Sequence, residues 1–473
     1  MNKTRRIYLL SPKDLSPETI AVTFAKTSRS PKPFDEIASE LTDERSAQFH
    51  EKWVVGYGHA SVAEHAVLHL ALENVSRLAI ETIEGNRLAS YTEKSSRYQQ
   101  WDEDAFYVPD EILGSSLETP YNETCKALFK AYQESIPKVE GWLKSEKPKQ
   151  SEESVRAFQR RIMGEVIDNC RFFLPAASLA NVGVTMNARS LEYAICKMLS
   201  SPLREVQDIG EKLREVGQAE APTLVKYAAC NKYMVSTRQK MSDIAERIPE
   251  QKSNDTFHLV DWDKTGEEKI LAAVLYRFDQ ARDYKSCLDY VANLPTAQRK
   301  KLAEDLMSDR GKFDQPLREF EYAQMTFEVL MDQGAYFEFK RHRMMTQTMK
   351  RLSPEDGFAI PKAITEAGYG DEYIAVMDRA ADIYAQIAEL NPAASSYIIP
   401  NGYNRRVLCT MNLREFYNFY RLRSAENAHF SIRRISQRMA EKIEEIYPTL
   451  AQYLDRPREE TWRDIERDYF TVV

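Results

Sequence analysis

The fold is decided by RFFLPAASLANVGVTMNARSLEYAICKML, residues 171–199, and by SYIIPNGYNRRVLCTMNLREFYNFYRLR, residues 396–423. Each stretch places an apolar pair before a proline, followed by a polar segment, the sequence T-M-N-x-R and a run with helical spacing. Further upstream, residues 61–90 and 316–346 also match each other, in the same order. Two matched blocks in one order predict a tandem duplication with strong divergence.

We place the repeats at residues 1–235 and 256–473, joined by a polar connector at residues 236–255. The connector, STRQKMSDIAERIPEQKSND, is almost wholly polar and contains one proline, as is typical of a surface segment. A second polar patch at residues 145–154 predicts a loop inside the first repeat.

Local patterns indicate both strands and helices. Residues 17–26 alternate like a strand, residues 62–83 have helical spacing, and residues 256–262 again alternate like a strand. Strands mixed with long amphipathic helices predict an α/β (α+β) fold. We expect each repeat to be a mixed β-sheet packed with long helices.

Composition narrows the class of protein. The chain has 43% hydrophobic and 29% charged residues, as in a soluble globular protein, and its net charge of −7 disfavours a nucleic-acid binder. It has 16 glycines and neither G-x-G-x-x-G nor G-x-x-x-x-G-K-[ST], so a nucleotide or flavin would bind without a glycine-rich phosphate loop. The sequence has neither a signal-peptide core nor a bilayer-spanning apolar run, and its six cysteines are scattered. We therefore expect a reduced, cytoplasmic protein without a membrane segment.

Two basic or hydroxyl-rich segments are candidates for anion binding. Arg341, His342 and Arg343 are consecutive, and such close cations repel one another unless an anion lies between them. The segment at residues 90–98, SYTEKSSRY, combines hydroxyls with an arginine, as in an anion-binding turn. The alternatives are a solvated basic turn and a capped turn with surface aromatics.

The T-M-N-x-R sequences supply a second group of candidates. Asn187 and Arg189 recur as Asn412 and Arg414, and Asn418 follows Arg414 by four residues on one helix face. Asparagine and arginine together can bind a ring edge or a phosphate. The alternative is helix capping by the asparagines with surface salt bridges from the arginines.

The histidines near the start of the chain invite a metal interpretation. His59, His65 and His69 lie close to Glu64, but no third ligand has the usual spacing and no H-E-x-x-H occurs. We favour a packed, hydrogen-bonded helix for His65 and His69, and we predict no metal site.

Several of these motifs resemble the flavin-dependent thymidylate synthases. The similar stretches are G-H-A-S-V-A-E-H at residues 58–65, N-R-L-A-S-Y-T-E-K-S-S-R-Y at 86–98 and T-M-N-A-R-S-L at 185–191. The family signature is R-H-R-x-x-S, followed by a Y-x-E-x-S-x-R-Y loop and an N-A-R-S-L helix. The resemblance implies an α/β homotetramer that converts deoxyuridylate (dUMP) to thymidylate. Methylenetetrahydrofolate would give the carbon, and NAD(P)H would give electrons through FAD.

The resemblance implies that the first repeat keeps the nucleotide loop. Glu93, Ser95 and Arg97 match the positions that hold the dUMP phosphate and sugar, and Arg171 matches another nucleotide-binding arginine. The R-H-R position reads Gly85-Asn86-Arg87, so two of its three side chains are lost while Ser90 is kept. Met198 occupies the position of the arginine that contacts the pyrimidine.

The second repeat shows the opposite pattern. It keeps R-H-R and the pyrimidine-contacting position at Arg423, to which the resemblance assigns the catalytic role of stabilising charge on the ring. Its nucleotide loop is lost, because Met349, Arg351 and Ser353 replace E-x-S-x-R, and Ser396 stands where the first repeat has Arg171. Thr346 replaces the motif serine. Glu338 replaces a glutamine that contacts the substrate, and Arg341 is a further substrate candidate. The implied FAD-binding residues are Ser61, Glu64, Asn187, Arg189, Arg341, His342, Arg343, Asn412, Arg414 and Asn418.

The complementary losses suggest that the repeats combine into one complete type of site. A homodimer of this chain would then be a pseudo-tetramer. The reciprocal combination, of the degenerate R-H-R of the first repeat with the degenerate nucleotide loop of the second, would form no working site. The alternatives are a flavin-dependent methyltransferase of another pyrimidine nucleotide and a non-catalytic flavin or nucleotide binder.

Overall fold

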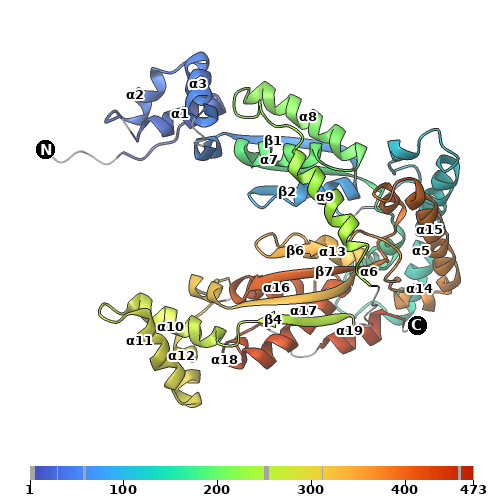
Figure 1. Ribbon diagram of the computed structural model, residues 1–473. Coiled ribbons are helices and arrows are strands. Elements are labelled where there is room, and N and C mark those ends of the chain that lie inside the picture. Colours follow the sequence, from blue (N-terminus) through green and yellow to red (C-terminus); the bar gives the residue numbers. More distant parts are fainter. Residues whose placement is uncertain are drawn as a thin grey trace. The chain divides into compact units, whose positions relative to one another are not determined.

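The computed structural model describes residues 6–28, 30–56, 60–97, 99–249, 255–311, 313–455 and 460–471. The chain divides into two compact units (Figure 1). The first unit is Met1–Ser95, Phe106–Ser115 and Ala177–Gln251, and the second is Ser96–Ala105, Ser116–Ala176 and Lys252–Val473. Two segments of the first repeat therefore belong to the second unit. The repeat boundaries themselves stay a prediction.

The first unit is built on a three-stranded antiparallel sheet in the order β1-β3-β2. Its strands are β1 (Val67–Ser76), β2 (Ala89–Glu93) and β3 (Leu179–Asn187). Buried and exposed residues alternate along β1 and β3, because successive side chains of a strand point to opposite faces. The packing helices are α4 (Arg77–Glu84), α7 (Ala188–Leu199) and α8 (Arg204–Glu220).

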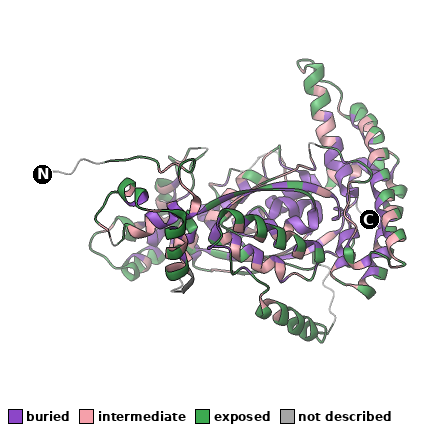
Figure 2. Cartoon of the chain, turned by 90° about the horizontal axis from the view of Figure 1, so that it is seen from above, coloured by how far each residue is buried: buried purple, intermediate pink, exposed green. Residues whose placement is uncertain are grey.

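Short helices precede this sheet, and one long exposed helix follows it. The preceding elements are α1 (Pro17–Lys26), α2 (Phe34–Ser39), α3 (Asp43–His50), η1 (Glu51–Gly56) and η2 (Ala60–His65), and η3 (Asp110–Ile112) lies in a loop. The following helix, α9 (Lys232–Ala245), has no buried residue and is drawn as exposed in Figure 2. It covers part of the segment predicted as a polar connector, of which residues 250–254 lie outside the described part of the chain.

The second unit contains a four-stranded antiparallel sheet in the order β4-β5-β7-β6. Its strands are β4 (Phe257–Trp262), β5 (Gln324–Asp332), β6 (Thr346–Met349) and β7 (Asn404–Asn412). Its helices are α5 (Glu118–Glu146), α6 (Val155–Cys170), η4 (Arg171–Phe173), α10 (Gly266–Phe278), α11 (Tyr284–Asn293), α12 (Thr296–Met307), η5 (Arg318–Tyr322), α13 (Gln333–Phe339), α14 (Lys362–Glu366), α15 (Gly370–Leu390), η6 (Ala394–Ile398), α16 (Leu413–Arg423), α17 (Phe430–Ile446), α18 (Pro448–Ala451) and α19 (Trp462–Tyr469).

The two sheets share one topology. The order β1-β3-β2 in the first unit corresponds to β5-β7-β6 in the second, and β4 adds an edge strand to the second sheet. In both sheets the strand that ends in T-M-N lies between its two partners. The tandem α+β arrangement predicted from the repeated blocks is therefore confirmed.

Each residue of T-M-N-x-R has the same structural role in both repeats. The hydroxyls of Thr185 and Thr410 make cross-strand hydrogen bonds of 2.9 Å, to His69 and Thr326. The methionines that follow are buried, and the asparagines cap α7 and α16 by accepting backbone N–H groups. Such caps are typically worth about 0.5–2 kcal/mol. The motif therefore recurs because it ends a strand and starts a helix.

Equivalent segments of the two repeats also pair with each other inside the second unit. Pro175 lies opposite Pro400 in an antiparallel bridge. The N–H of Ala176 donates to the carbonyl of Ile399 at 2.9 Å, and the N–H of Asn401 donates to the carbonyl of Leu174 at 3.0 Å. Helices α5 and α15 pack beside this bridge. The matched prolines of the sequence thus mark a local pseudo-twofold contact.

Three local predictions were wrong. Residues 17–26 form helix α1, because Ser16 caps it and Pro17 starts it, although Ile20, Val22 and Phe24 alternate as in a strand. Residues 62–83 contain strand β1, which a register shift and the cap at Ser76 separate from α4. The sheets are antiparallel in the described residues, whereas a mixed sheet was expected. The strand at residues 256–262 is confirmed, and the loop at residues 145–154 is confirmed from residue 147, because α5 continues to Glu146.

Candidate functional site

Arg97 is held in place by a carboxylate from the end of α6. Its Nε and Nη2 each donate to Asp168 at 2.7 Å, and its Nη1 donates to the carbonyl of Asn427 at 2.9 Å. All three nitrogens of the guanidinium are therefore engaged. The two parallel bonds fix the plane of the group, as in other bidentate arginine–carboxylate pairs.

Arg171 lies buried in the second unit, beside residues of the second repeat. It is 2% exposed, and its Nη2 donates to the carbonyl of Gly334 at 3.3 Å and lies 3.7 Å from a carboxylate oxygen of Glu338. Burial lowers the pKa of Arg171, and the charge of Glu338 opposes this shift. The Nε of Arg171 and the Oε1 of Glu338 are buried without a hydrogen bond in the described structure.

Arg423 approaches the same carboxylate from the last turn of α16. Its Nη1 donates to Oε2 of Glu338 at 3.0 Å, and its Nε donates to Nε2 of His342 at 2.9 Å. Its Nη2 makes no hydrogen bond to any described residue. Burial lowers the pKa of Arg423; the charge of Glu338 opposes this, while the charges of Arg341 and Arg97 add to it. Glu338 therefore lies between Arg171 and Arg423, with further cations nearby.

The geometry of His342 defines its protonation state. Because its Nε2 accepts from Arg423, its Nδ1 carries the proton and faces Glu415 at 3.6 Å. Burial lowers the pKa of His342, so the ring is neutral at pH 7. Arg341, which precedes it, is exposed, whereas Arg343 is partly buried.

The remaining second-repeat candidates lie around the start of α16. Arg414 donates to Glu321 at 3.1 Å and to the carbonyl of Pro316 at 2.9 Å. Asn418 accepts from Arg421 at 3.4 Å, and Asn412 accepts the N–H of Glu415 as the helix cap. The interpretation of these residues as a cap and salt bridges therefore describes the structure.

The first unit contains the other first-repeat candidates. The side chain of Glu93 is 1% exposed and forms an ion pair of 3.2 Å with Arg77. Ser95, the last residue of this segment of the unit, is partly buried. Arg189 forms an ion pair with Glu64, as Arg414 does with Glu321, and Asn187 caps α7. Tyr98, also part of the predicted loop, lies outside the described residues.

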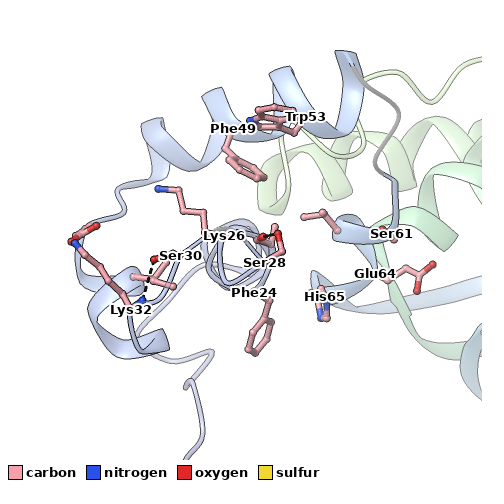
Figure 3. A pocket seen from close by; sticks show the side chains of 14 residues that line it. Phe24, Lys26, Ser28, Ser30, Lys32, Phe49, Trp53, Ser61, Glu64 and His65 are labelled. Atoms are coloured by element: carbon pink, nitrogen blue, oxygen red, sulfur yellow. Dashed lines mark hydrogen bonds and ion pairs between the residues drawn. The ribbon is translucent and has the colours of Figure 1, made fainter.

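Ser61 and Glu64 line a cavity of about 860 Å³ in the first unit. Figure 3 shows Phe24, Phe49 and Trp53 among its lining side chains, with Ser61 and Glu64 on the side away from Lys32. His65, in η2, packs against Phe24 with a ring-centroid distance of 5.0 Å. His69 lies on strand β1, so the predicted common helix for these two histidines was wrong.

No group of three His, Cys, Asp or Glu side chains in the described residues is arranged to hold a metal ion. His59 lies outside that part of the chain. No described helix is long and apolar enough to cross a bilayer.

Arg97, Arg171, Arg423 and Glu338 form what we call the arginine cluster. Two residues that contact this cluster, Asp168 and His429, were not predicted from the sequence. Asp168 precedes Arg171 by three residues: it lies in the last turn of α6, and Arg171 caps the end of that helix. This spacing is the only sequence signal for Asp168. His429 caps α17, and its Nε2 donates to the carbonyl of Asp168 at 3.0 Å while its Nδ1 accepts the N–H of Ser431. Burial lowers its pKa well below the usual value, and the charges of Arg171 and Arg97 add to this.

Comparison with known proteins now identifies the family. A family model described as thymidylate synthase complementing protein matches residues 10–223 and 258–449. The chain belongs to this family. The two matched ranges of this Thy1-family chain fall inside the two predicted repeats. The recognition made from the sequence motifs is therefore confirmed.

Individual relatives of this Thy1-family chain differ in how much of the chain they match: some match most of it, and others match less than half. It is 30% identical over 433 residues to a UPF0159 protein of Chlamydia muridarum, a match that covers 88% of this chain and 82% of that protein. It is 29% identical over 218 residues to the flavin-dependent thymidylate synthase of Clostridium tetani, covering 45% of this chain and 82% of that protein. The corresponding enzyme of Sulfolobus acidocaldarius is 30% identical over 218 residues, covering 45% of this chain and 73% of that protein.

The guanidinium groups of the second repeat are chemically suited to bind the pyrophosphate of a flavin dinucleotide. Arg341 and Arg343 flank His342 at the end of α13, and guanidinium groups match the charge and geometry of pyrophosphate oxygens. The asparagines of T-M-N-x-R cap helices, and its arginines form ion pairs with Glu64 and Glu321.

Proposed function

We propose that this chain is a flavin-dependent thymidylate synthase whose active site combines residues of both repeats. One observation carries the proposal: within the second unit, Arg97 and Arg171 of the first repeat lie in the same cluster as Glu338 and Arg423 of the second. The two half-sites that the sequence keeps in different repeats are therefore parts of one group of charges.

In this proposal dUMP binds at the arginine cluster. Arg171 and Arg97 supply positive charge for the phosphate, with Ser95 as a further contact, and Arg423 stabilises negative charge on the pyrimidine as its C5 becomes nucleophilic. The methylene group comes from methylenetetrahydrofolate and replaces the C5 proton. FAD reduced by NAD(P)H supplies the hydride that completes the methyl group.

The reciprocal combination of half-sites lacks these cations. Met198, at the position equivalent to Arg423, is 1% exposed and packs in the core of the first unit. Ser396, at the position equivalent to Arg171, donates to the carbonyl of Leu352 at 2.7 Å. These contacts support one type of working site. In our proposal a homodimer of this chain would act as a pseudo-tetramer that contains this type of site alone.

The test uses the purified full-length chain. We expect a visible flavin spectrum and release of tritium from C5-labelled dUMP in the presence of methylenetetrahydrofolate and NADPH. Arg423→Ala should lower the rate of release by about 100-fold to 1,000-fold, as the loss of a charge-stabilising donor does elsewhere. Arg421→Ala, on the same helix, is the matched control and should retain activity.

Two outcomes contradict the proposal. A protein that binds no FAD after purification or reconstitution has no means of supplying the hydride. Binding of two dUMP molecules per chain, measured by calorimetry, contradicts the combined site, because the repeats would then bind independently.

One observation favours a second candidate, a methyltransferase of another pyrimidine nucleotide. Glu338 is an acceptor-only carboxylate, and its Oε1 makes no hydrogen bond to the described residues. An exocyclic amino group, such as that of deoxycytidylate, could donate to it, whereas a uracil carbonyl could not. Faster tritium release from C5-labelled deoxycytidylate than from dUMP would favour this candidate. Flavin binding without release from either nucleotide would favour a non-catalytic binder.

A further inference from the structure

The segment at residues 6–10, RIYLL, belongs to the first unit but lies outside its helices and strands. The side chains of Ile7 and Leu9 are 90% and 82% exposed, and Ile7 is the most exposed large apolar side chain among the described residues. Apolar residues at every second position are typical of a strand with one covered face. In the single chain nothing among the described residues covers these two side chains.

One carboxylate of α2 holds the segment in this exposed position. Arg6 forms an ion pair with Asp35, and the hydroxyl of Tyr8 donates to the same carboxylate at 3.2 Å. Figure 1 shows the segment on the side of α1–α3 that faces away from β1. Exposed ion pairs of this kind contribute about 0–1 kcal/mol, so the segment is only weakly held on its own chain.

Strand β1 has a partner on one side only in the described structure, because it lies at the edge of the order β1-β3-β2. Its sequence, VLHLALENVS, has ten residues and contains neither proline nor lysine. Leu68, Leu70 and Leu72 point from it into the core, where they are buried. An edge strand of this kind presents a row of unpaired backbone N–H and C=O groups, which is a template for a further strand.

The second sheet shows what covers the equivalent edge there. Strand β5, which corresponds to β1, pairs with β4 on its outer side, and the two are antiparallel. Strand β4 comes directly before the helices that lead into β5, just as residues 6–10 come before the helices that lead into β1. The segment at residues 6–10 is therefore the first-repeat counterpart of β4, although it is not on the sheet.

The second sheet also predicts the register of such a pairing. Counted from T-M-N through the central strands, Leu70 of β1 corresponds to Phe327 of β5. Phe327 lies opposite Leu259 of β4. The equivalent pairing places Leu9 opposite Leu70. Because side chains directly opposite each other share one face of a sheet, Leu9 would then extend the buried row of β1.

The charges agree with this register. With Leu9 at that position, Ile7 lies opposite Leu72 on the core face, and Arg6 lies opposite Glu73 on the outer face. Glu73 is exposed and makes no ion pair with any described residue. Opposite charges directly across two strands attract, whereas a slip by one residue would bring Ile7 opposite Glu73 instead.

We propose that residues 6–10 of one copy pair antiparallel with the outer edge of β1 in a second copy, and that the exchange is reciprocal in a homodimer. In a single chain Asp35 holds the segment on α2, so the segment and the free edge do not meet. Two copies related by a twofold axis satisfy both at once, which is the usual logic of strand exchange. The proposal concerns assembly alone and stands whether or not the chain makes thymidylate.

The test is disulfide cross-linking of the full-length chain in a Cys230→Ser background, which removes the exposed native thiol. Tyr8→Cys and Ala71→Cys are directly opposite in the proposed register, where Cα atoms about 4.5–5.5 Å apart allow a disulfide. We expect a covalent dimer on a non-reducing gel. Tyr8→Cys with Val67→Cys is the matched control: Val67 is exposed on the same face, but it lies about 13 Å further along β1 and should not cross-link.

Sedimentation of uncross-linked protein supplies a second measurement. Ile7→Asp together with Leu9→Asp should raise the dissociation constant of the dimer by at least about 100-fold, because both lose the burial of a large apolar side chain. Ile248→Asp is the control, since Ile248 is 69% exposed elsewhere in the same unit, and it should change the constant by less than about 2-fold. Glu73→Arg should weaken the dimer by about 2-fold to 10-fold, and Arg6→Glu in the same chain should restore it.

Four results would overturn the proposal. A disulfide between Tyr8→Cys and Ala71→Cys in a band of monomer size, identified by mass spectrometry, would show that the segment pairs with β1 of its own chain. Equal cross-linking in the Val67 control would show that the segment has no fixed register. A dimer that Ile7→Asp with Leu9→Asp leaves intact would place the interface elsewhere, and a monomeric wild-type chain would exclude the exchange.

Discussion

Replacement of Glu338 tests the centre of the arginine cluster. Its carboxylate lies 3.7 Å from Arg171 and 3.0 Å from Arg423, and its side chain is 8% exposed. At an effective dielectric constant of about 20, these contacts are worth about 4.5 and about 5.5 kcal/mol, respectively, before the cost of desolvation is subtracted. Removing one partner from a buried ion pair typically destabilises a protein by about 3–5 kcal/mol. We expect Glu338→Leu to lower the free energy of unfolding by this amount.

The assay is urea unfolding followed by circular dichroism, with attention to the transition of the second unit. Glu338→Gln should cost less than Glu338→Leu, because the amide oxygen still accepts from Arg423. Glu321→Gln is the control: its ion pair with Arg414 is 3.1 Å long but about one third exposed, and such pairs contribute about 0–1 kcal/mol. A free energy of unfolding for Glu338→Leu within about 0.5 kcal/mol of the wild-type value, as for neutral surface substitutions, would contradict a stabilising role for the contacts of Glu338 with Arg171 and Arg423.

The Glu338→Gln variant also tests whether the arginine cluster binds the substrate or only stabilises the fold. If the phosphate of dUMP binds beside Arg171, it replaces the counter-charge that Glu338→Gln removes. Saturating dUMP should therefore raise the melting temperature of Glu338→Gln by more than it raises that of the wild type. Equal or smaller stabilisation would refute phosphate binding at this cluster, even if the stability result is as expected.

Three further predictions follow from single contacts. A double-mutant cycle of Arg97→Gln and Asp168→Asn, measured by urea unfolding, should give a coupling of about 1.5–3 kcal/mol for the bidentate pair, and a coupling near zero would contradict its geometry. Asn412→Ala should destabilise the protein by about 0.5–2 kcal/mol and Asn412→Ser by much less, so equal losses would exclude capping. Because burial lowers the pKa of His429 in the folded state, the unfolded state binds more protons, and stability should fall as the pH falls below about 6.5, by up to about 1.4 kcal/mol per pH unit. His429→Gln should flatten that slope in thermal melts, and an unchanged slope would show that another group causes it.

The fold could be predicted from the repeated blocks of the sequence. It was harder to predict where one apolar pattern is compatible with both a strand and a helix. The matched blocks predicted two related sheets, and their common strand order confirms the duplication. Strand β1 was misread because it runs directly into α4, so that its apolar residues merge with a helical pattern. Helix α1 was predicted wrongly for the opposite reason, because Ile20, Val22 and Phe24 alternate as in a strand, although Ser16 and Pro17 are the residues that start a helix.

The arginines of the candidate site could be found by resemblance, but their neighbours could not. Arg171 and Arg423 belong to recognisable motifs, whereas Asp168 joins the cluster through its bond to Arg97 and His429 through its bond to the carbonyl of Asp168. Their partners lie 71 and 261 positions away in the sequence. A carboxylate at the end of a helix and a histidine at a cap are common features, so neither position carries a local signal for the contact it makes.

Comparison of the repeats separates residues that build the fold from residues that distinguish the candidate site. Thr, Met, Asn and Arg of T-M-N-x-R occur in both repeats and have equivalent roles in both: a cross-strand hydrogen bond, a buried side chain, a helix cap and an ion pair with a glutamate. Their recurrence is therefore explained by structure. Arg171 and Arg423 each occur in one repeat only, where the other has Ser396 and Met198. If the cluster served stability alone, there would be no reason for its cations to come from different repeats and meet at one carboxylate. Substitution of Arg171 or Arg423, which occur in one repeat only, should therefore change binding more than folding. Substitution of the residues that both repeats share should change folding more than binding.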